Sequence, residues 1–169
     1  MNKLPITINN LQFAKQKQVL SGEIDAMWFE RLRDVLVANE AAPDGENQVR
    51  YSLSGWVDVQ DRAFLKMELD ADLLMDCQRC LSDTPVKLQL NFIYQITHQN
   101  ERELLESEPM EDDVDLIEAD TNMDVGLLIE DELLMALPIA PVHPEACMAL
   151  KLTSGEKVNP FEALQKLKK

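Results

Sequence analysis

Basic residues are missing from a long stretch of this 169-residue chain. No lysine or arginine occurs between Arg102 and Lys151, whereas 14 aspartates and glutamates fall in that interval, and the whole chain has a net charge of −15. A surface of this charge repels phosphate, which disfavours tight and direct binding of nucleic acid. A basic protein partner fits the charge better, and the alternative is that the acids only keep the protein in solution.

Long apolar runs are missing as well. No run of about 18 apolar residues occurs, so we expect no membrane-spanning helix, and the N-terminal residues MNKLPITINN lack the apolar segment of a signal peptide. The odd number of cysteines, three, argues against a disulfide framework. We therefore expect a cytoplasmic protein with a single domain over residues 1–169.

Motifs of the common enzyme classes are also lacking. The chain has only five glycines and no glycine-rich phosphate loop, and neither a GxSxG nor an HExxH motif is present. The RNP aromatic pair and the GxxG loop of RNA-binding domains are absent too. Carboxylates are abundant, but acids on exposed strand faces and in loops are usually solvated. We predict no catalytic residue and no enzymatic activity.

Alternation of apolar and polar residues predicts three consecutive strands. The first runs from Tyr51 to Val59, and the second places an apolar residue at every odd position from Ala63 to Cys77. The third resumes the pattern on even positions from Val86 to Ile96. A period of two with one apolar and one charged face is typical of a sheet that is wet on one side. Short connections favour an antiparallel meander.

Helical spacing of apolar residues predicts two main helices. One covers Glu23 to Ala38, is capped by Ser21 or Asp25, and places Trp28 in the core. The other covers Val125 to Leu137, begins at Asn122 or Asp124, and ends before Pro138. With one or two short strands in residues 1–22, the expected fold is α+β. An antiparallel sheet of about five or six strands, open or curled toward a barrel, packs against the two helices.

Two segments are predicted to be mobile. Residues 101–121 contain ten acids and one base up to Asp120, which is typical of an acidic loop. Residues 148–169 form a C-terminal tail in which Asn159-Pro160-Phe161 is a favourable helix start. The last 19 residues carry five lysines and two acids.

Two sets of charged residues are candidates for partner binding. The acidic set would meet a basic partner through Glu111, Asp112, Asp113, Asp115, Glu130, Asp131 and Glu132, the last three on the outside of the second helix. The basic set would contact RNA directly through Arg79, Lys87, Lys166, Lys168 and Lys169. A steep salt dependence of RNA affinity would distinguish the second hypothesis from the first.

Cysteine and histidine spacing suggests a metal site. Cys77-x-x-Cys80 follows the long strand, and His143-x-x-x-Cys147 lies in a proline-bounded loop after the second helix. Two close ligand pairs are what a tetrahedral Cys3His zinc site needs. Two alternatives remain open: a redox dithiol, although no thioredoxin-like βαβ pattern surrounds it, and three packed thiols that bind nothing. A zinc enzyme would need an open coordination position, which four protein ligands would close.

Several blocks together resemble the YceD family of bacterial large-ribosomal-RNA accumulation proteins. They cover roughly the last 100 residues and comprise Cys77-Gln78-Arg79-Cys80-Leu81 with the strand through Phe92, Ile129–Pro138 with the acidic segment before it, Pro141–Cys147, and Asn159–Lys168. The resemblance implies a role in the synthesis, processing or stability of large-subunit (23S) ribosomal RNA. It implies no firm activity or cofactor, although cysteines that recur in many members suggest zinc.

The resemblance and the charge point to different surfaces. A role with RNA suggests a basic surface, and this chain is strongly acidic. Our hypothesis joins the two: the acidic surface binds a basic ribosomal protein or processing enzyme, and RNA accumulation follows from assembly. The alternative is a direct RNA-binding processing factor with a structural zinc site. The sequence indicates no oligomeric state.

Overall fold

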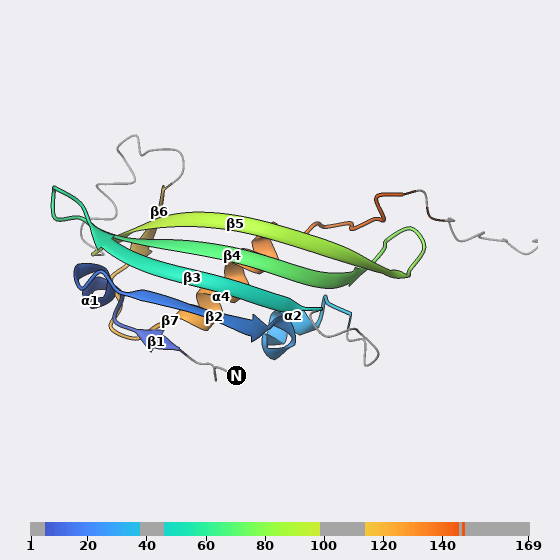
Figure 1. Cartoon of the computed structure of the whole chain (residues 1–169), viewed down its shortest axis with the longest axis horizontal. Coiled ribbons are helices and arrows are strands. Elements are labelled where there is room, and N and C mark those ends of the chain that lie inside the picture. The colour runs from blue at the N-terminus through green and yellow to red at the C-terminus, as the bar shows by residue number, and fades with distance from the viewer. Residues whose placement is uncertain (1–5, 38–45, 99–113, 146, 148–169) are drawn as a thin grey trace, which may run out of the picture.

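A five-stranded sheet is the largest element of the protein (Figure 1). The computed structural model describes residues 6–37, 46–98, 114–145 and 147. The strands lie in the order β2-β3-β4-β5-β6. Their bounds are β2 Val19–Asp25, β3 Gln48–Val57, β4 Ala63–Asp76, β5 Asp83–Thr97 and β6 Val114–Glu118.

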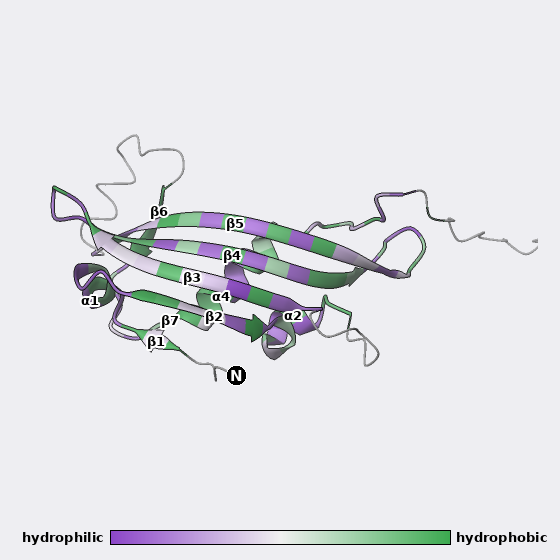
Figure 2. Cartoon of the chain, viewed as in Figure 1, coloured by the Kyte–Doolittle hydropathy of each residue, from purple (hydrophilic) through white to green (hydrophobic). Residues whose placement is uncertain are grey.

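The three central strands confirm the predicted meander. β3, β4 and β5 pair antiparallel along the chain, and Leu65 of β4 lies opposite Tyr94 of β5. Along β4, Leu65, Met67 and Leu69 are buried while Glu68 is exposed. Figure 2 shows the resulting bands of alternating hydropathy along these strands. One face of the sheet therefore faces the core, and the other carries polar side chains.

The sheet is mixed rather than purely antiparallel, because β6 runs parallel to the end of β5. Val114 lies opposite Ile93 and Glu118 opposite Thr97. The prediction of a loop was wrong for these five residues, since pairing with β5 supplies the backbone partners that the sequence pattern does not reveal. Within the described residues β2 and β6 do not pair with each other, so the sheet is open and the barrel alternative is not found.

Residues 23–37, the described part of the first predicted helix, do not form it. Their first part belongs to β2, which pairs with β3 over seven residues. A 3-10 turn, η1 (Ala26–Trp28), and a short helix, α2 (Glu30–Arg33), follow. Pairing with β3 satisfies the backbone of β2, so tertiary context overrides the helical spacing of the apolar residues.

Two residues of this segment, Asp25 and Trp28, differ in how they compare with the prediction. Asp25 is a cap, as predicted, because its side chain accepts a hydrogen bond from the backbone N–H of Met27 at 2.9 Å. Trp28 is not a core residue, because 58% of it is exposed. Ile24, Leu32 and Leu36 of the predicted apolar stripe are buried in the core, whereas the 3-10 turn after Asp25 leaves Trp28 on the surface.

The predicted second helix is confirmed as α4 (Val125–Ala136). The Asp124 side chain caps its start by accepting from the N–H groups of Gly126 and Leu127 at 2.8 and 3.3 Å. The helix ends at Ala136, and its C-cap Leu137 directly precedes Pro138. α4 crosses one face of the sheet (Figure 1) and buries Val125, Ile129 and Leu133 in the core.

The N-terminal residues form a short strand and an additional helix. β1 (Thr7–Ile8) pairs with β7 (Met123–Asp124), which confirms a short strand there. Helix α1 (Asn10–Lys15) was not predicted, although Asn9 caps it by accepting from the Gln12 N–H at 2.9 Å. α1 lies directly on β3 at Gly55, where an added Cβ would stand 2.6 Å from the Cα of Ala14. Only glycine permits this approach.

Several predictions fall outside the described residues. They concern most of the acidic loop, with Glu111, Asp112 and Asp113, and the C-terminal tail with Lys166, Lys168 and Lys169. Among the residues that are described, no helix is long and apolar enough to cross a membrane.

Candidate metal centre

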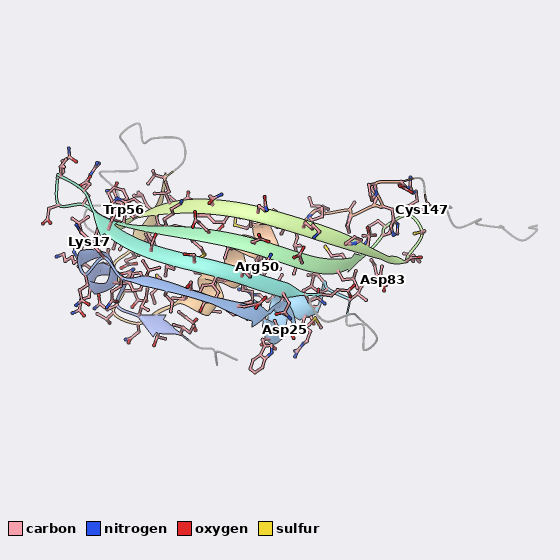
Figure 3. All side chains as sticks on the ribbon, in the orientation of Figure 1. Lys17, Asp25, Arg50, Trp56, Asp83 and Cys147 are labelled. Atoms are coloured by element: carbon pink, nitrogen blue, oxygen red, sulfur yellow. The ribbon has the colours of Figure 1, made fainter. Side chains whose placement is uncertain are left out.

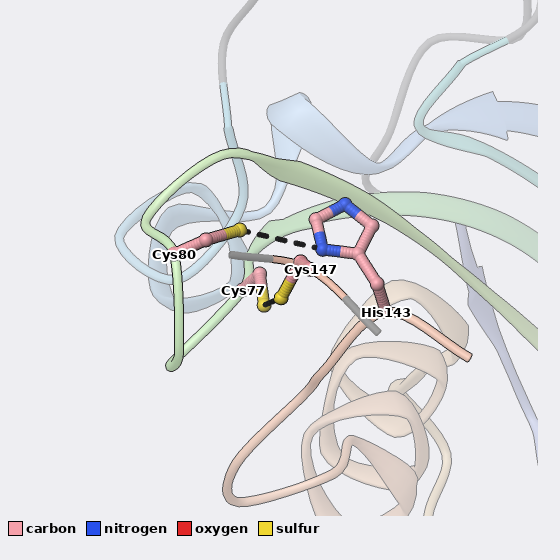
Figure 4. Close-up of side chains that lie close together, drawn as sticks. All are labelled: Cys77, Cys80, His143 and Cys147. Atoms are coloured by element: carbon pink, nitrogen blue, oxygen red, sulfur yellow. Dashed lines mark hydrogen bonds between the residues drawn. The ribbon is translucent and has the colours of Figure 1, made fainter. Parts of the chain in front are cut away.

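Four side chains predicted as metal ligands come together at one end of the sheet. The ligand atoms of Cys77, Cys80, His143 and Cys147 all lie within 4.8 Å of one another (Figure 4). Figure 3 shows Cys147 at the same end of the molecule as Asp83, the first residue of β5. The fold thus brings together two pairs that are far apart in the sequence, which is the requirement for the predicted site.

The first pair is presented by the turn between β4 and β5. The N–H of Cys77 donates to the Ser82 carbonyl at 2.9 Å, and the N–H of Leu81 donates to the Cys77 carbonyl at 2.8 Å. Leu81 has a φ of 58°, a left-handed conformation that is costly for a leucine. The turn therefore curls back tightly after Cys80 and directs both thiols to the same side.

The second pair is positioned by the segment after α4. The N–H of Gln78 donates to the carbonyl of Pro141 at 2.9 Å, which joins this segment to the turn. The imidazole Nε2 of His143 lies 2.9 Å from the carbonyl oxygen of Asp83. A carbonyl only accepts, so Nε2 carries the hydrogen and Nδ1 faces the cluster with its lone pair when the ring is neutral. Histidine ligands of zinc typically use this arrangement.

Two ligand-to-ligand distances within the cluster match a tetrahedral zinc site. Two sulfurs at about 2.3 Å from a tetrahedral ion lie about 3.8 Å apart, and a sulfur and an imidazole nitrogen lie about 3.5 Å apart. The Sγ atoms of Cys77 and Cys147 are 3.8 Å apart, and Cys80 Sγ is 3.5 Å from His143 Nδ1. The three cysteines are free thiols, since a disulfide would need a sulfur separation of about 2.05 Å.

The surroundings favour the thiolate form that a metal requires. Burial by itself raises the pKa of Cys77, which is fully buried, but N–H donors of Arg79, Cys80 and His143 outweigh it and lower the pKa to about 5. The hydrogen bond to the Asp83 carbonyl and the neighbouring Cys77 raise the pKa of His143. Metal ligands must be deprotonated, so metal binding would release the protons that the cluster holds.

Arg79 contacts the cluster from outside. Its Nε donates to Cys147 Sγ at 2.9 Å, and its NH2 donates to the Glu145 carbonyl at 3.0 Å. Contact with Cys147 raises the pKa of Arg79. Three thiolates and one neutral imidazole around Zn²⁺ carry a net charge of −1, which this guanidinium offsets. The sequence analysis predicted that Arg79 contacts RNA. Its position inside the Cys-x-x-Cys motif is the signal that could have predicted its contact with the metal cluster.

The other residues predicted to bind RNA or a partner differ in burial and in ion pairing. Lys87 pairs with Asp72 at 2.7 Å, and 79% of its side chain is exposed. Glu130 was expected on the outside of α4 but is buried, because Arg31 closes over it with three hydrogen bonds of 2.7–3.1 Å. Asp131 also pairs with Arg31 at 2.7 Å, yet 55% of its side chain stays exposed.

Three of the predicted acidic residues do lie close together. Burial and the nearby carboxylates of Asp115 and Asp131 raise the pKa of Glu132, against the opposing hydrogen bond from Tyr94. The Tyr94 hydroxyl donates to Glu132 at 2.7 Å. Asp115 comes from β6, so the sheet edge and α4 together form an acidic surface that consists of Asp115, Asp131 and Glu132.

Comparison with known proteins decides the family. The family model described as "Large ribosomal RNA subunit accumulation protein YceD" matches residues 65–168, which include all four candidate ligands. The chain belongs to the YceD family. The match confirms the family that the sequence motifs suggest.

A curated relative extends the likeness of this YceD-family chain to its N-terminus. The large ribosomal RNA subunit accumulation protein YceD of Haemophilus influenzae is 28% identical over 183 aligned positions, which cover 98% of this chain and 97% of the relative. No solved structure gives a significant match.

Proposed function

We propose that this protein is a non-enzymatic factor that supports the accumulation of large-subunit ribosomal RNA by binding a basic protein partner. The observation that carries the proposal is the family match over residues 65–168, whose description names the accumulation of this RNA. The relative that aligns along nearly the whole chain has the same name. The net charge of −15 supports a basic protein rather than RNA as the direct ligand.

The acidic surface of Asp115, Asp131 and Glu132 supports this choice of partner. The raised pKa of Glu132 reflects burial together with neighbouring negative charge, which a cationic side chain would relieve. Asp115 and Asp131 are exposed. Glu130 contributes little to this surface, because its carboxylate is buried against Arg31.

Direct RNA binding is less well supported by the described residues. Arg79 is engaged with Cys147 and the Glu145 carbonyl, and Lys87 is paired with Asp72. Both side chains are exposed, but both are already engaged within the protein. Two engaged cations on an acidic protein provide few phosphate contacts.

We also propose that Cys77, Cys80, His143 and Cys147 hold one zinc ion in a structural role. Four protein ligands would close a tetrahedral site and leave no position for a substrate. The two 2.9 Å hydrogen bonds that already link the turn to the segment after α4, Gln78 to Pro141 and His143 to Asp83, support such a role. Zinc would add a cross-link between the sheet and the C-terminal part of the chain.

The function is tested in a strain that lacks the chromosomal gene. Wild type, Asp115→Lys/Asp131→Lys and the matched control Glu23→Lys/Glu68→Lys are expressed at equal levels, and the ratio of large- to small-subunit ribosomal RNA is measured. The control pair carries the same charge change on the opposite face of the sheet. The proposal expects wild type and control to restore the ratio and the first variant to fail.

Affinity purification identifies the type of partner. Tagged wild-type protein is recovered from lysate with and without nuclease treatment. A basic protein that remains bound after nuclease treatment supports the proposal. Recovery of ribosomal RNA with no basic protein under either condition would contradict it and favour the direct RNA hypothesis.

A further inference from the structure

A groove lies beside the candidate metal centre. It has a volume of about 430 Å³ and is formed by the residues after α2, the end of β4, and the end of α4 with the segment that follows. The side chains that matter for binding are Asp34, Val35, Asp76, Leu134, Leu137 and Ile139. None of them is a candidate metal ligand, so the groove is a separate site.

Apolar side chains in this groove are exposed to an unusual degree. Ile139 is completely exposed (102%) and Val35 is 44% exposed, while Leu134 and Leu137 are half-buried. An exposed valine and isoleucine beside half-buried leucines around one hollow are typical of a surface that another protein covers. Ile139 lies next to Pro138, where α4 has ended, so the isoleucine does not pack back into the helix.

The charges at the groove are of one sign and are not neutralised. Asp34 and Asp76 line it, and no lysine or arginine does. Within the described part of the chain neither carboxylate forms an ion pair, whereas Asp70, Asp72 and Glu130 each pair with a base. A ligand for this groove must therefore bring positive charge as well as apolar side chains.

We propose that this groove is the docking site for a basic, amphipathic segment of a protein partner. Apolar side chains of the segment would contact Val35, Leu134 and Ile139, and its lysines or arginines would pair with Asp34 and Asp76. Amphipathic segments bind apolar grooves in this way, with charge at the rim fixing orientation. The inference rests on the proposed function, because it locates the basic partner named there. Asp131, three residues before Leu134 on α4, extends the acidic rim toward the acidic surface.

The groove and the candidate metal centre share their walls. Gln78 and Pro141 both line the groove and are joined by the 2.9 Å hydrogen bond between the turn and the segment after α4. Cys77 and His143, two of the candidate metal ligands, come from the same two segments. Loss of metal would therefore release one wall of the groove and weaken binding of the segment.

A defined peptide tests the binding chemistry. The probe is a fluorescein-labelled synthetic peptide with leucines at helical spacing and lysines elsewhere, compared with the same peptide carrying glutamates for lysines. Anisotropy is measured with the full chain at two salt concentrations. We expect the lysine peptide to bind, at least about tenfold more tightly than the glutamate peptide.

Matched variants test the place of binding. We expect Asp34→Lys/Asp76→Lys to weaken the lysine peptide by at least about tenfold, and Glu23→Lys/Glu68→Lys, with the same charge change, by less than about threefold. Ile139→Ser should weaken it, whereas Val59→Ser, at a position that is 96% exposed and distant in the fold, should not. Equal losses of peptide affinity in variant and control would show that net charge alone drives binding. That result would overturn the groove as the docking site.

Cross-linking in cells identifies the natural occupant. A photoreactive benzoylphenylalanine at position 139 of the full chain should cross-link to a basic protein, and Asp34→Lys/Asp76→Lys should abolish the product. Cross-links only to residues 148–169 of this chain, to an acidic protein or to RNA would overturn the proposal. If nuclease-resistant purification still recovers a basic protein while position 139 never cross-links to it, the groove is wrong and the proposed function stands. If no basic protein is recovered, the proposed function itself fails.

Discussion

The backbone N–H of Gln78 donates to the carbonyl oxygen of Pro141 at 2.9 Å, across 63 residues of sequence. This bond joins the β4–β5 turn to the segment that follows α4. The same two segments supply the four candidate zinc ligands and two walls of the groove. The proposed metal binding and the proposed partner docking would therefore be mechanically connected, and a change at one site should affect the other.

Arg79 should tune the affinity of the metal site without being a ligand. Replacing Arg79 by alanine removes the N–H donor to Cys147 and the positive charge beside the thiolates. Loss of such an outer contact typically weakens metal binding about tenfold or more. Competition with a chromophoric chelator measures the change in metal affinity. Lys87→Ala is the control, because it removes another exposed cation, which lies on β5. Equal affinity in Arg79→Ala and wild type would contradict this role.

Asn10 should be a strong determinant of stability. Its side chain is fully buried, donates to the Glu118 carbonyl at 2.8 Å and accepts from the Asp120 N–H at 3.0 Å. Asn10→Ala removes both part-buried hydrogen bonds, which should cost roughly 1–3 kcal/mol of unfolding free energy. Urea denaturation checks this. The control Asn91→Ala, at an exposed position, should change stability by less than about 0.5 kcal/mol.

Glu130 should make stability depend on pH. Burial raises the pKa of Glu130, but hydrogen bonds from Arg31 outweigh it and hold the pKa below its ordinary value. A carboxyl with a lowered folded-state pKa stabilises the fold above its unfolded pKa of about 4.3, and that stability is lost as pH falls through the folded pKa. Glu130→Gln should therefore be less stable than wild type by roughly 1–2 kcal/mol near neutral pH.

The pH series gives the check on Glu130. The difference in unfolding free energy between wild type and Glu130→Gln should shrink as the pH falls below about 4. Glu23→Gln, at an exposed site, should show no comparable difference. A gap that stays constant from neutral to strongly acidic pH would mean that the charge of Glu130 is not what stabilises the fold.

Gly55 should tolerate no side chain. A Cβ at this position would stand 2.6 Å from the Cα of Ala14, and backbone cannot move aside as a flexible side chain can. Gly55→Ala should destabilise the protein by roughly 1–3 kcal/mol, measured by chemical denaturation. Ser54→Ala, the neighbouring change on the opposite face of β3, should be close to neutral. A stable Gly55→Ala would show that α1 does not lie against β3 as described.

Local patterns predicted the parts of the fold that depend on local rules. The alternation from Ala63 to Cys77 predicted β4, because the two faces of that strand meet different environments along its length. Asp124 and Pro138 predicted the limits of α4, because capping and the missing proline N–H act within a few residues. The candidate ligands were predicted for a similar reason, since each pair is close in sequence.

Other parts depend on contacts between distant segments. Residues 23–25 belong to a strand because β3 lies beside them, although the apolar spacing that begins at Glu23 suits a helix. β6 forms by parallel pairing with β5. Its acidic sequence shows no sustained alternation of apolar and polar residues that would predict a strand. Glu130 is buried because Arg31, 99 residues earlier, reaches it. No signal within a short window predicts any of these three contacts.

Metal content of the purified full-length protein tests the central claim most directly. Native mass spectrometry and thermal unfolding are applied to wild type, Cys80→Ser and the control Ser82→Ala, which changes the same turn without removing a ligand. We predict about one zinc ion per chain in wild type and Ser82→Ala, and loss of both the ion and several degrees of Tm in Cys80→Ser. Wild-type protein without metal, together with an unchanged Tm in Cys80→Ser, would contradict the account and reduce the three cysteines to packing residues.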